Sequence, residues 1–162
     1  MNLILVRHGK AEDHFVRGSD GERKLVEKGW EQARNVGVFL HENSLVPDII
    51  ITSPLARAKE TASGICESLN REGVKIQPTV AHWLQCGMSP ELALAELSAY
   101  KELERVGIVG HEPDFSMLVE YILGVECGRV QVKKASVISL QSCNPPRRGA
   151  VLDGLISQKW LK

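Results

Sequence analysis

The sequence predicts an α/β protein, a three-layer α/β/α sandwich with a mostly parallel central sheet. Short apolar runs without polar alternation occur at 3–6, 48–52 and 105–109, and such runs are typical of strands buried on both faces. Segments with helical spacing of apolar residues lie between these runs. Strands that alternate with helices favour a parallel sheet covered on both faces. With 162 residues and no linker or repeat, we expect one domain spanning residues 1–162.

Composition and charge exclude several classes of partner. Basic and acidic residues balance at 20 each, so no overall field attracts nucleic acid or an anionic membrane, and we expect neither as a partner. No apolar stretch has membrane-spanning length, and residues 3–6 are too short for a signal-peptide core. The four cysteines form no C-x-x-C pair, which favours reduced thiols and a cytoplasmic location.

Two helices are predicted between the first strand and residue 73. After Gly29, apolar residues with helical spacing continue to Leu40. The pair Ser53-Pro54 is a typical helix start, with Ser53 as the N-cap and the proline in the first helical position. Apolar residues at intervals of three and four then continue to Leu69, so we expect the second helix to follow the second strand closely.

The second half of the chain predicts two more helices and several short strands. Ser89-Pro90 repeats the helix start for a shorter helix around 92–97, and Asp114 is the expected cap of a fourth helix that ends at Gly124. In the last forty residues, apolar clusters separated by Gly and Pro turns predict short strands, some antiparallel, at 130–132, 137–140 and 151–156.

Charged or titratable side chains follow each of the three apolar strands. Arg7 and His8 come directly after the first strand, Arg57 comes shortly after the second, and His111 follows the third. Ligands of parallel α/β sheets bind beyond the carboxyl ends of the strands. We therefore expect Arg7, His8, Arg57 and His111 to converge on one crevice.

These four side chains are suited to phosphoryl chemistry. Guanidinium groups match phosphate oxygens and stay charged, and Arg57 would lie in the first turn of a helix, whose backbone amides attract anions. One imidazole can attack phosphorus, while the other stabilises charge on an equatorial oxygen. We expect the guanidinium groups to lower the pKa of His8. We also expect its second ring nitrogen to donate to a backbone carbonyl or an acidic group.

Residues 3–9 resemble the RHG signature of the histidine phosphatase superfamily, the phosphoglycerate-mutase-like enzymes. The stretch 7–12 resembles the SixA-type phosphohistidine phosphatases in particular. Three further motifs follow in the family's order, at 20–33, 53–62 and 109–113, so the resemblance covers nearly the whole chain. It implies a phosphoglycerate-mutase-like fold and one histidine-phosphatase-like domain.

The resemblance also implies a role for individual residues. His8 would carry a phosphohistidine intermediate, and Arg7, Arg57 and His111 would complete the phosphate pocket. Arg23 matches the arginine of the family's D-x-x-R-x-L-T segment and would reach the phosphate or the incoming substrate.

The source of the leaving-group proton is a departure from the family pattern. Larger members carry a glutamate in the region that corresponds to 81–87, where this sequence has no carboxylate and only His82 is a candidate proton donor. A phosphohistidine substrate fits this departure, because its leaving nitrogen can be protonated before the P–N bond breaks, whereas an ester needs more acid assistance. The short segment between Trp83 and Val106 also leaves little room for a lid, which favours a substrate displayed on a protein surface.

The sequence therefore predicts an enzyme, a metal-independent phosphatase without a cofactor. It would hydrolyse phosphohistidine on a protein of a phosphorelay or phosphotransfer system through phospho-His8. Two alternatives stay open: a small-molecule phosphomonoesterase of the same superfamily, and a non-catalytic phosphate-binding module. A metal held by His8 and His111 is disfavoured, because the flanking arginines would repel a cation and no third ligand is evident. The oligomeric state stays open, with a monomer favoured.

Overall fold

A computed structural model describes residues 1–14 and 18–161. Within these residues, six strands form one sheet in the order β3-β2-β4-β1-β5-β6. Strands β3, β2, β4 and β1 are parallel. Strand β5 pairs antiparallel with β1, and β6 pairs antiparallel with β5. The strands are β1 (Asn2–Arg7), β2 (Ile49–Thr52), β3 (Pro78–Val80), β4 (Arg105–Gly110), β5 (Val137–Gln141) and β6 (Val151–Ile156). The predicted mostly parallel central sheet is confirmed.

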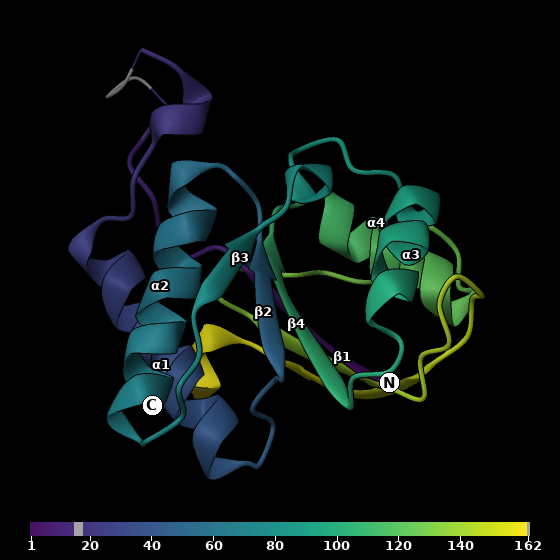
Figure 1. The fold of residues 1–162 in the computed structure, drawn as a ribbon. Coiled ribbons are helices and arrows are strands. Elements are labelled where there is room, and N and C mark those ends of the chain that lie inside the picture. The colour runs from purple at the N-terminus through teal and green to yellow at the C-terminus, as the bar shows by residue number, and fades with distance from the viewer. Residues whose placement is uncertain (15–17, 162) are drawn as a thin grey trace.

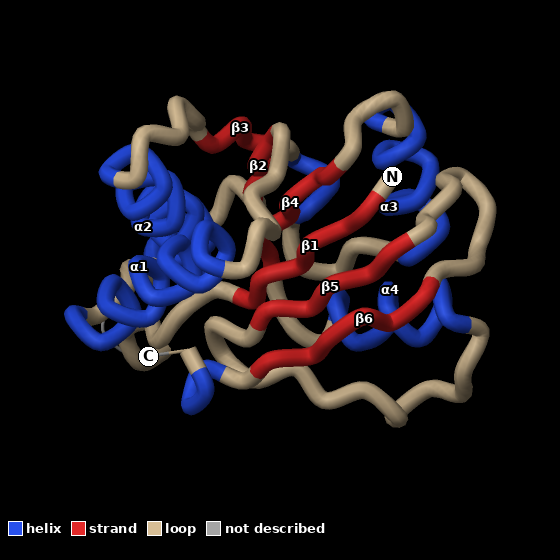
Figure 2. Tube along the Cα trace, turned by 90° about the horizontal axis from the view of Figure 1, so that it is seen from below, coloured by secondary structure: helices blue, strands red, loops and turns tan. Residues whose placement is uncertain are grey.

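Helices cover both faces of this sheet, as Figures 1 and 2 show. Helices α1 (Glu27–Glu42) and α2 (Ala56–Arg71) pack side by side on one face. Helices α3 (Pro90–Leu97) and α4 (Asp114–Leu123) lie together on the other. None of the helices in the described ranges combines the length and apolar character that crossing a membrane requires. The predicted three-layer α/β/α arrangement is confirmed.

The continuous apolar run of β1 reflects a strand buried on both faces. Leu3 and Leu5 belong to the core that packs against α3 and α4, where Phe115 is the largest buried side chain. Ile4 and Val6 belong to the core that packs against α1 and α2. Because successive side chains point to opposite faces of a sheet, both sets must be apolar.

The carboxyl ends of the parallel strands are aligned at one edge of the sheet. Arg7 of β1 pairs with Gly110 of β4, and Thr52 of β2 pairs with Val109. The residues that follow these strands therefore begin side by side, although they are far apart in the sequence. This alignment positions the site described below.

The predicted cap at Ser53 is wrong. Helix α2 begins at Ala56 with Leu55 as its N-cap residue, and the Ser53 hydroxyl instead contacts the ring of His111. The hydroxyl also accepts from the backbone N–H of Leu55, which precedes the helix, so its local contact lies outside α2. The start at Ser89 is confirmed, because its hydroxyl accepts a hydrogen bond from the backbone N–H of Leu92 at 3.1 Å.

The predicted cap at Asp114 is also wrong, since Asp114 is the first helical residue of α4 and Pro113 occupies the N-cap position. The Asp114 carboxylate accepts a hydrogen bond from the backbone N–H of Gly87 at 2.9 Å. It therefore fixes the loop that precedes α3 rather than the first turn of its own helix. The helix ends at Gly124 as predicted, with a left-handed φ of 69°.

The C-terminal strands are confirmed at 137–140 and 151–156, but not at 130–132. The carbonyl of Val132 accepts from Nη1 of Arg7 at 2.7 Å, and the N–H of Val130 donates to Oε1 of Glu120 at 2.7 Å. Side chains therefore use backbone groups that a strand ladder would need. Strand β3 was not predicted, because it has three residues, begins at a proline and lies at the sheet edge.

Candidate active site

A cavity of about 350 Å³ lies beyond the carboxyl ends of β1, β2 and β4. Five of the six residues predicted for the site line it: Arg7, His8, Arg23, Arg57 and His111. The predicted convergence of the strand-end residues is therefore confirmed. The sixth residue, His82, is exposed in a one-turn 3₁₀ helix (His82–Leu84) and is not part of the lining.

The two imidazoles face each other inside the cavity. The ring centroids of His8 and His111 are 5.3 Å apart, with 53° between the ring planes, and both residues are buried. Nδ1 of His8 donates to the carbonyl of Gly9 at 2.8 Å, which confirms the predicted backbone partner. Nε2 of His8 then carries the free lone pair that a nucleophile requires.

Both rings are neutral at neutral pH. The pKa of His8 is lowered to about 3, mainly by burial and to a smaller extent by the charges of His111, Arg57 and Arg7, while the bond to Gly9 opposes this change. Burial, followed by the charge of Arg57, lowers the pKa of His111 to about 4. The predicted direction for His8 is confirmed, but burial rather than the guanidinium groups is the larger cause.

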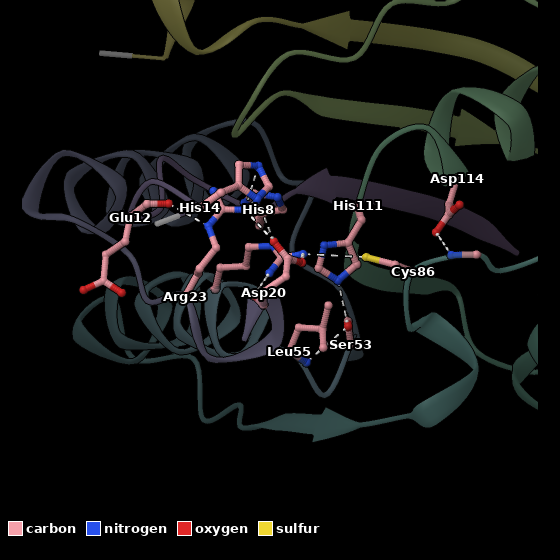
Figure 3. A network of polar contacts seen from close by, with 12 residues as sticks. His8, Glu12, His14, Asp20, Arg23, Ser53, Leu55, Cys86, His111 and Asp114 are labelled. Carbon is pink, nitrogen blue, oxygen red and sulfur yellow. Dashed lines mark hydrogen bonds and ion pairs between the residues drawn. The ribbon is translucent and has the colours of Figure 1, made fainter. Parts of the chain in front are cut away.

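Ser53 fixes the orientation of His111 (Figure 3). Its Oγ lies 2.8 Å from Nε2 of His111 and accepts from the backbone N–H of Leu55 at 3.3 Å. When the Ser53 hydroxyl donates to Nε2, the neutral imidazole carries its own hydrogen on Nδ1. The sequence analysis missed this role because Ser-Pro is also a helix-start signal, although its place directly after β2 could have indicated it.

Asp20 bridges two of the arginines (Figure 3). Its Oδ1 accepts from Nη1 of Arg23 at 2.8 Å, and its Oδ2 accepts from Nη2 of Arg57 at 2.9 Å. Nε of Arg23 also donates to the carbonyl of Glu12, and Nη1 of Arg57 to the carbonyl of Asp20, each at 2.7 Å. Asp20 thus holds two guanidinium groups at the same wall of the cavity.

Three buried donors of cavity-lining residues have no hydrogen-bond partner within the described ranges. They are Nε of Arg7, Nε of Arg57 and Nδ1 of His111. Buried polar groups are normally paired, because an unpaired donor loses its hydration without compensation. A tetrahedral oxyanion has acceptors for several donors at once, so this set fits a phosphoryl group.

Two further cavity residues could take part in proton transfer or nucleophilic attack. Glu112 follows His111 directly, and its Oε1 accepts from the backbone N–H of Ser116 at 3.0 Å; burial raises the pKa of the carboxyl. Cys86 lies 3.6 Å from Nη2 of Arg57, and burial raises the pKa of its thiol, which disfavours the reactive thiolate.

Lys134 and His14 also line the cavity, at its exposed rim. The sequence analysis assigned a role to neither, since both lie outside the strand-end motifs. Across the ranges that the structure describes, no three or more His, Cys, Asp or Glu side chains form a group that could hold a metal ion.

Comparisons with known proteins agree with this geometry. The family model of the histidine phosphatase superfamily (branch 1) matches residues 3–83. An uncharacterised protein of Picosynechococcus sp. is 33% identical, with 99% of each chain covered. The mitochondrial serine/threonine-protein phosphatase Pgam5 of Drosophila grimshawi is 35% identical. The matched region covers 51% of this chain and 32% of that relative's length.

The solved structure of the protein histidine phosphatase SixA complexed with tungstate has the same fold. It matches over 100% of both chains with a TM-score of 0.84 and 21% sequence identity. Fold and paired histidines thus define a phosphoglycerate-mutase-like α/β protein. The chain belongs to the histidine phosphatase superfamily.

Proposed function

We propose that this protein is a metal-independent phosphatase that hydrolyses phosphohistidine on a partner protein through a phospho-His8 intermediate. One observation carries the proposal. A neutral imidazole with a free Nε2 lies in a cavity lined by Arg7, Arg57 and His111, each of which has a buried nitrogen without a hydrogen-bond partner among the described residues. A module that only binds phosphate would need the donors but not the nucleophile.

In the first step, Nε2 of His8 attacks phosphorus, and the P–N bond of the substrate breaks as the new P–N bond forms. The two arginine Nε–H groups and Nδ1–H of His111 donate to the equatorial oxygens, where charge accumulates. The leaving nitrogen of the substrate histidine takes up a proton, so the side chain departs as a neutral imidazole. In the second step, water attacks phospho-His8, inorganic phosphate leaves, and His8 is regenerated.

Glu112 is the group that supplies the proton to the leaving atom and removes a proton from the attacking water. It is a half-buried carboxyl in the cavity, and burial raises its pKa, while hydrogen bonds from Ser116 oppose this change. His82 was predicted for this role, but its exposed position outside the lining does not support it.

The accessible mouth of the cavity supports a protein substrate. Helix α3, which lies in the segment between Leu84 and Arg105, packs against α4 and so covers a face of the sheet rather than the cavity. No carboxylate of residues 81–87 is present to assist an alkyl ester. A tetrahedral oxyanion, tungstate, is bound by the similar SixA structure.

The test is to trap the intermediate. A carrier protein labelled on phosphohistidine and a panel of phosphate esters are incubated in chelator with wild type, His8→Ala and Cys86→Ser. We expect acid-labile label on wild type and on Cys86→Ser, none on His8→Ala, and faster turnover of the carrier than of the esters. Label retained on His8→Ala would contradict the mechanism. Faster ester hydrolysis would favour the phosphomonoesterase, and binding of phosphate without turnover would favour the binding module.

A further inference from the structure

Lys134 is held at a fixed position on the rim of the cavity. The turn that carries it is bound to the end of β1 on both sides, because the N–H of Ala135 donates to the carbonyls of Arg7 and His8 at 3.0 and 3.2 Å. The carbonyl of Val132 accepts from Nη1 of Arg7 at 2.7 Å. The ammonium group is exposed, but its backbone is fixed to the residues that hold the nucleophile.

Lys10 lies near Lys134 in an equally fixed loop. Its N–H donates to Oε1 of Gln32 at 2.8 Å, and its carbonyl accepts from the N–H of Val26 at 3.1 Å. Burial lowers the pKa of Lys134, and the nearby charges of Arg7, Arg23 and Lys10 add to this effect. Four positive groups are therefore gathered at this side of the cavity.

The two lysines differ from the arginines in making no direct contact with a carboxylate, although the charge of Asp13 acts on Lys134 and opposes the fall in its pKa. Arg23 and Arg57 are both paired with Asp20. Among residues 1–14 and 18–161, neither lysine side chain forms a hydrogen bond or an ion pair that would balance its charge. Because the whole chain has zero net charge, this positive rim is a local feature.

The rim lysines are not needed for the phosphoryl group itself. In the proposed mechanism, the side chains of Arg7, Arg57 and His111, which line the cavity, already supply donors for it. An exposed ammonium on a flexible stem is suited to a carboxylate in water rather than to bidentate recognition of a buried oxyanion. The rim lysines are therefore available to an anionic group outside the cavity, beside the phosphorylated residue.

We infer that Lys10 and Lys134 form a docking site for carboxylates on the surface of the protein that carries the phosphohistidine. This inference rests on the proposed function and adds the charge of the partner: the substrate histidine is surrounded by acidic residues. Complementary charge of this kind mainly raises the rate of association and weakens with salt.

The experiment compares two substrates for each variant. One is a histidine-phosphorylated carrier protein with acidic residues beside its phosphohistidine, and the other is free phosphohistidine. The variants are Lys134→Gln, the double variant Lys10→Gln/Lys134→Gln, and Lys75→Gln. Lys75 is an exposed lysine that precedes β3 and so lies at the opposite edge of the sheet. The readout is the ratio of kcat/KM for the carrier to kcat/KM for free phosphohistidine.

We expect the ratio to fall about fourfold in the double variant at low salt, from roughly twofold for each exposed charge pair, and to be unchanged in Lys75→Gln. The fall should disappear at high salt, and also with a carrier whose acidic residues are neutralised. An unchanged ratio, or equal losses for both substrates, would overturn the docking site while leaving the phosphatase activity intact. Failure of wild type to hydrolyse either substrate would instead reject the proposed function.

Discussion

Ser53 and His111 are 58 residues apart in the sequence, yet Oγ of one lies 2.8 Å from Nε2 of the other. We expect Ser53→Ala to lower kcat about tenfold with little change in KM, because loss of one hydrogen bond of about 1.4 kcal/mol releases the His111 ring from its catalytic orientation. Steady-state kinetics on a phosphohistidine substrate measures this. Ser68→Ala removes another buried hydroxyl that is hydrogen-bonded to a backbone carbonyl, and it should keep kcat. If Ser53→Ala altered KM and left kcat unchanged, Ser53 would not orient His111 for catalysis.

The proposed proton transfer by Glu112 can be tested by varying the leaving group of the substrate. We expect Glu112→Gln to lower kcat/KM about a hundredfold for alkyl phosphates, and much less for phosphohistidine, because proton donation matters more when the leaving atom is basic. With a series of aryl phosphates, the rate of Glu112→Gln should depend more steeply on the pKa of the leaving group than the rate of wild type. The control is Glu91→Gln, an exposed glutamate in the first turn of α3. An equal loss for every leaving group would show that Glu112 does not transfer the proton.

The bridging carboxylate of Asp20 competes with the phosphoryl group for the arginines. We expect Asp20→Asn to lower the Ki of inorganic phosphate about fivefold, which corresponds to about 1 kcal/mol of repulsion between charges near 4 Å apart in water. Competitive inhibition of wild type and variant measures it, with Glu126→Gln, an exposed residue paired with Arg129, as the control. Weaker inhibition in Asp20→Asn would mean that alignment of Arg23 and Arg57 outweighs the repulsion.

The buried histidines make stability depend on pH. The unfolded chain protonates them below about pH 6.5, whereas the folded protein does so only near 4 for His111 and 3 for His8. Unfolding therefore takes up protons in this window, so the free energy of unfolding falls as the pH falls from about 6.5 and levels off below about 3. Each histidine contributes a slope of up to about 1.4 kcal/mol per pH unit.

Urea unfolding in phosphate-free buffer between about pH 5 and 6.5 measures this slope. We expect His111→Gln to reduce it by about one proton, whereas His41→Gln, at the exposed end of α1, should keep the slope of wild type. If His111→Gln also keeps the wild-type slope, His111 is not held neutral by the fold.

The three strands that carry the site, β1, β2 and β4, could be predicted because buried parallel strands have a continuous apolar pattern. The residues directly after them, such as His8 and His111, could therefore be placed in one cavity. Contacts made by side chains across the fold could not be predicted. Ser53 and Asp114 have the composition of helix caps, and only tertiary partners at His111 and Gly87 redirect them. Glu112 and Lys134 belong to no periodic pattern, so their place in the lining follows from the loops alone.

The alignment of strand ends at one edge of the sheet has a practical consequence. The cavity takes its strand-end groups from three segments, near residues 7, 57 and 111, and no short stretch of the chain contains them all. A cleaved fragment or a partly folded intermediate that lacks the parallel pairing of β1, β2 and β4 would have no complete catalytic centre. Turnover is therefore a direct measure of how many molecules are fully folded, and an activity assay can serve as the readout when this protein is screened for stabilising substitutions.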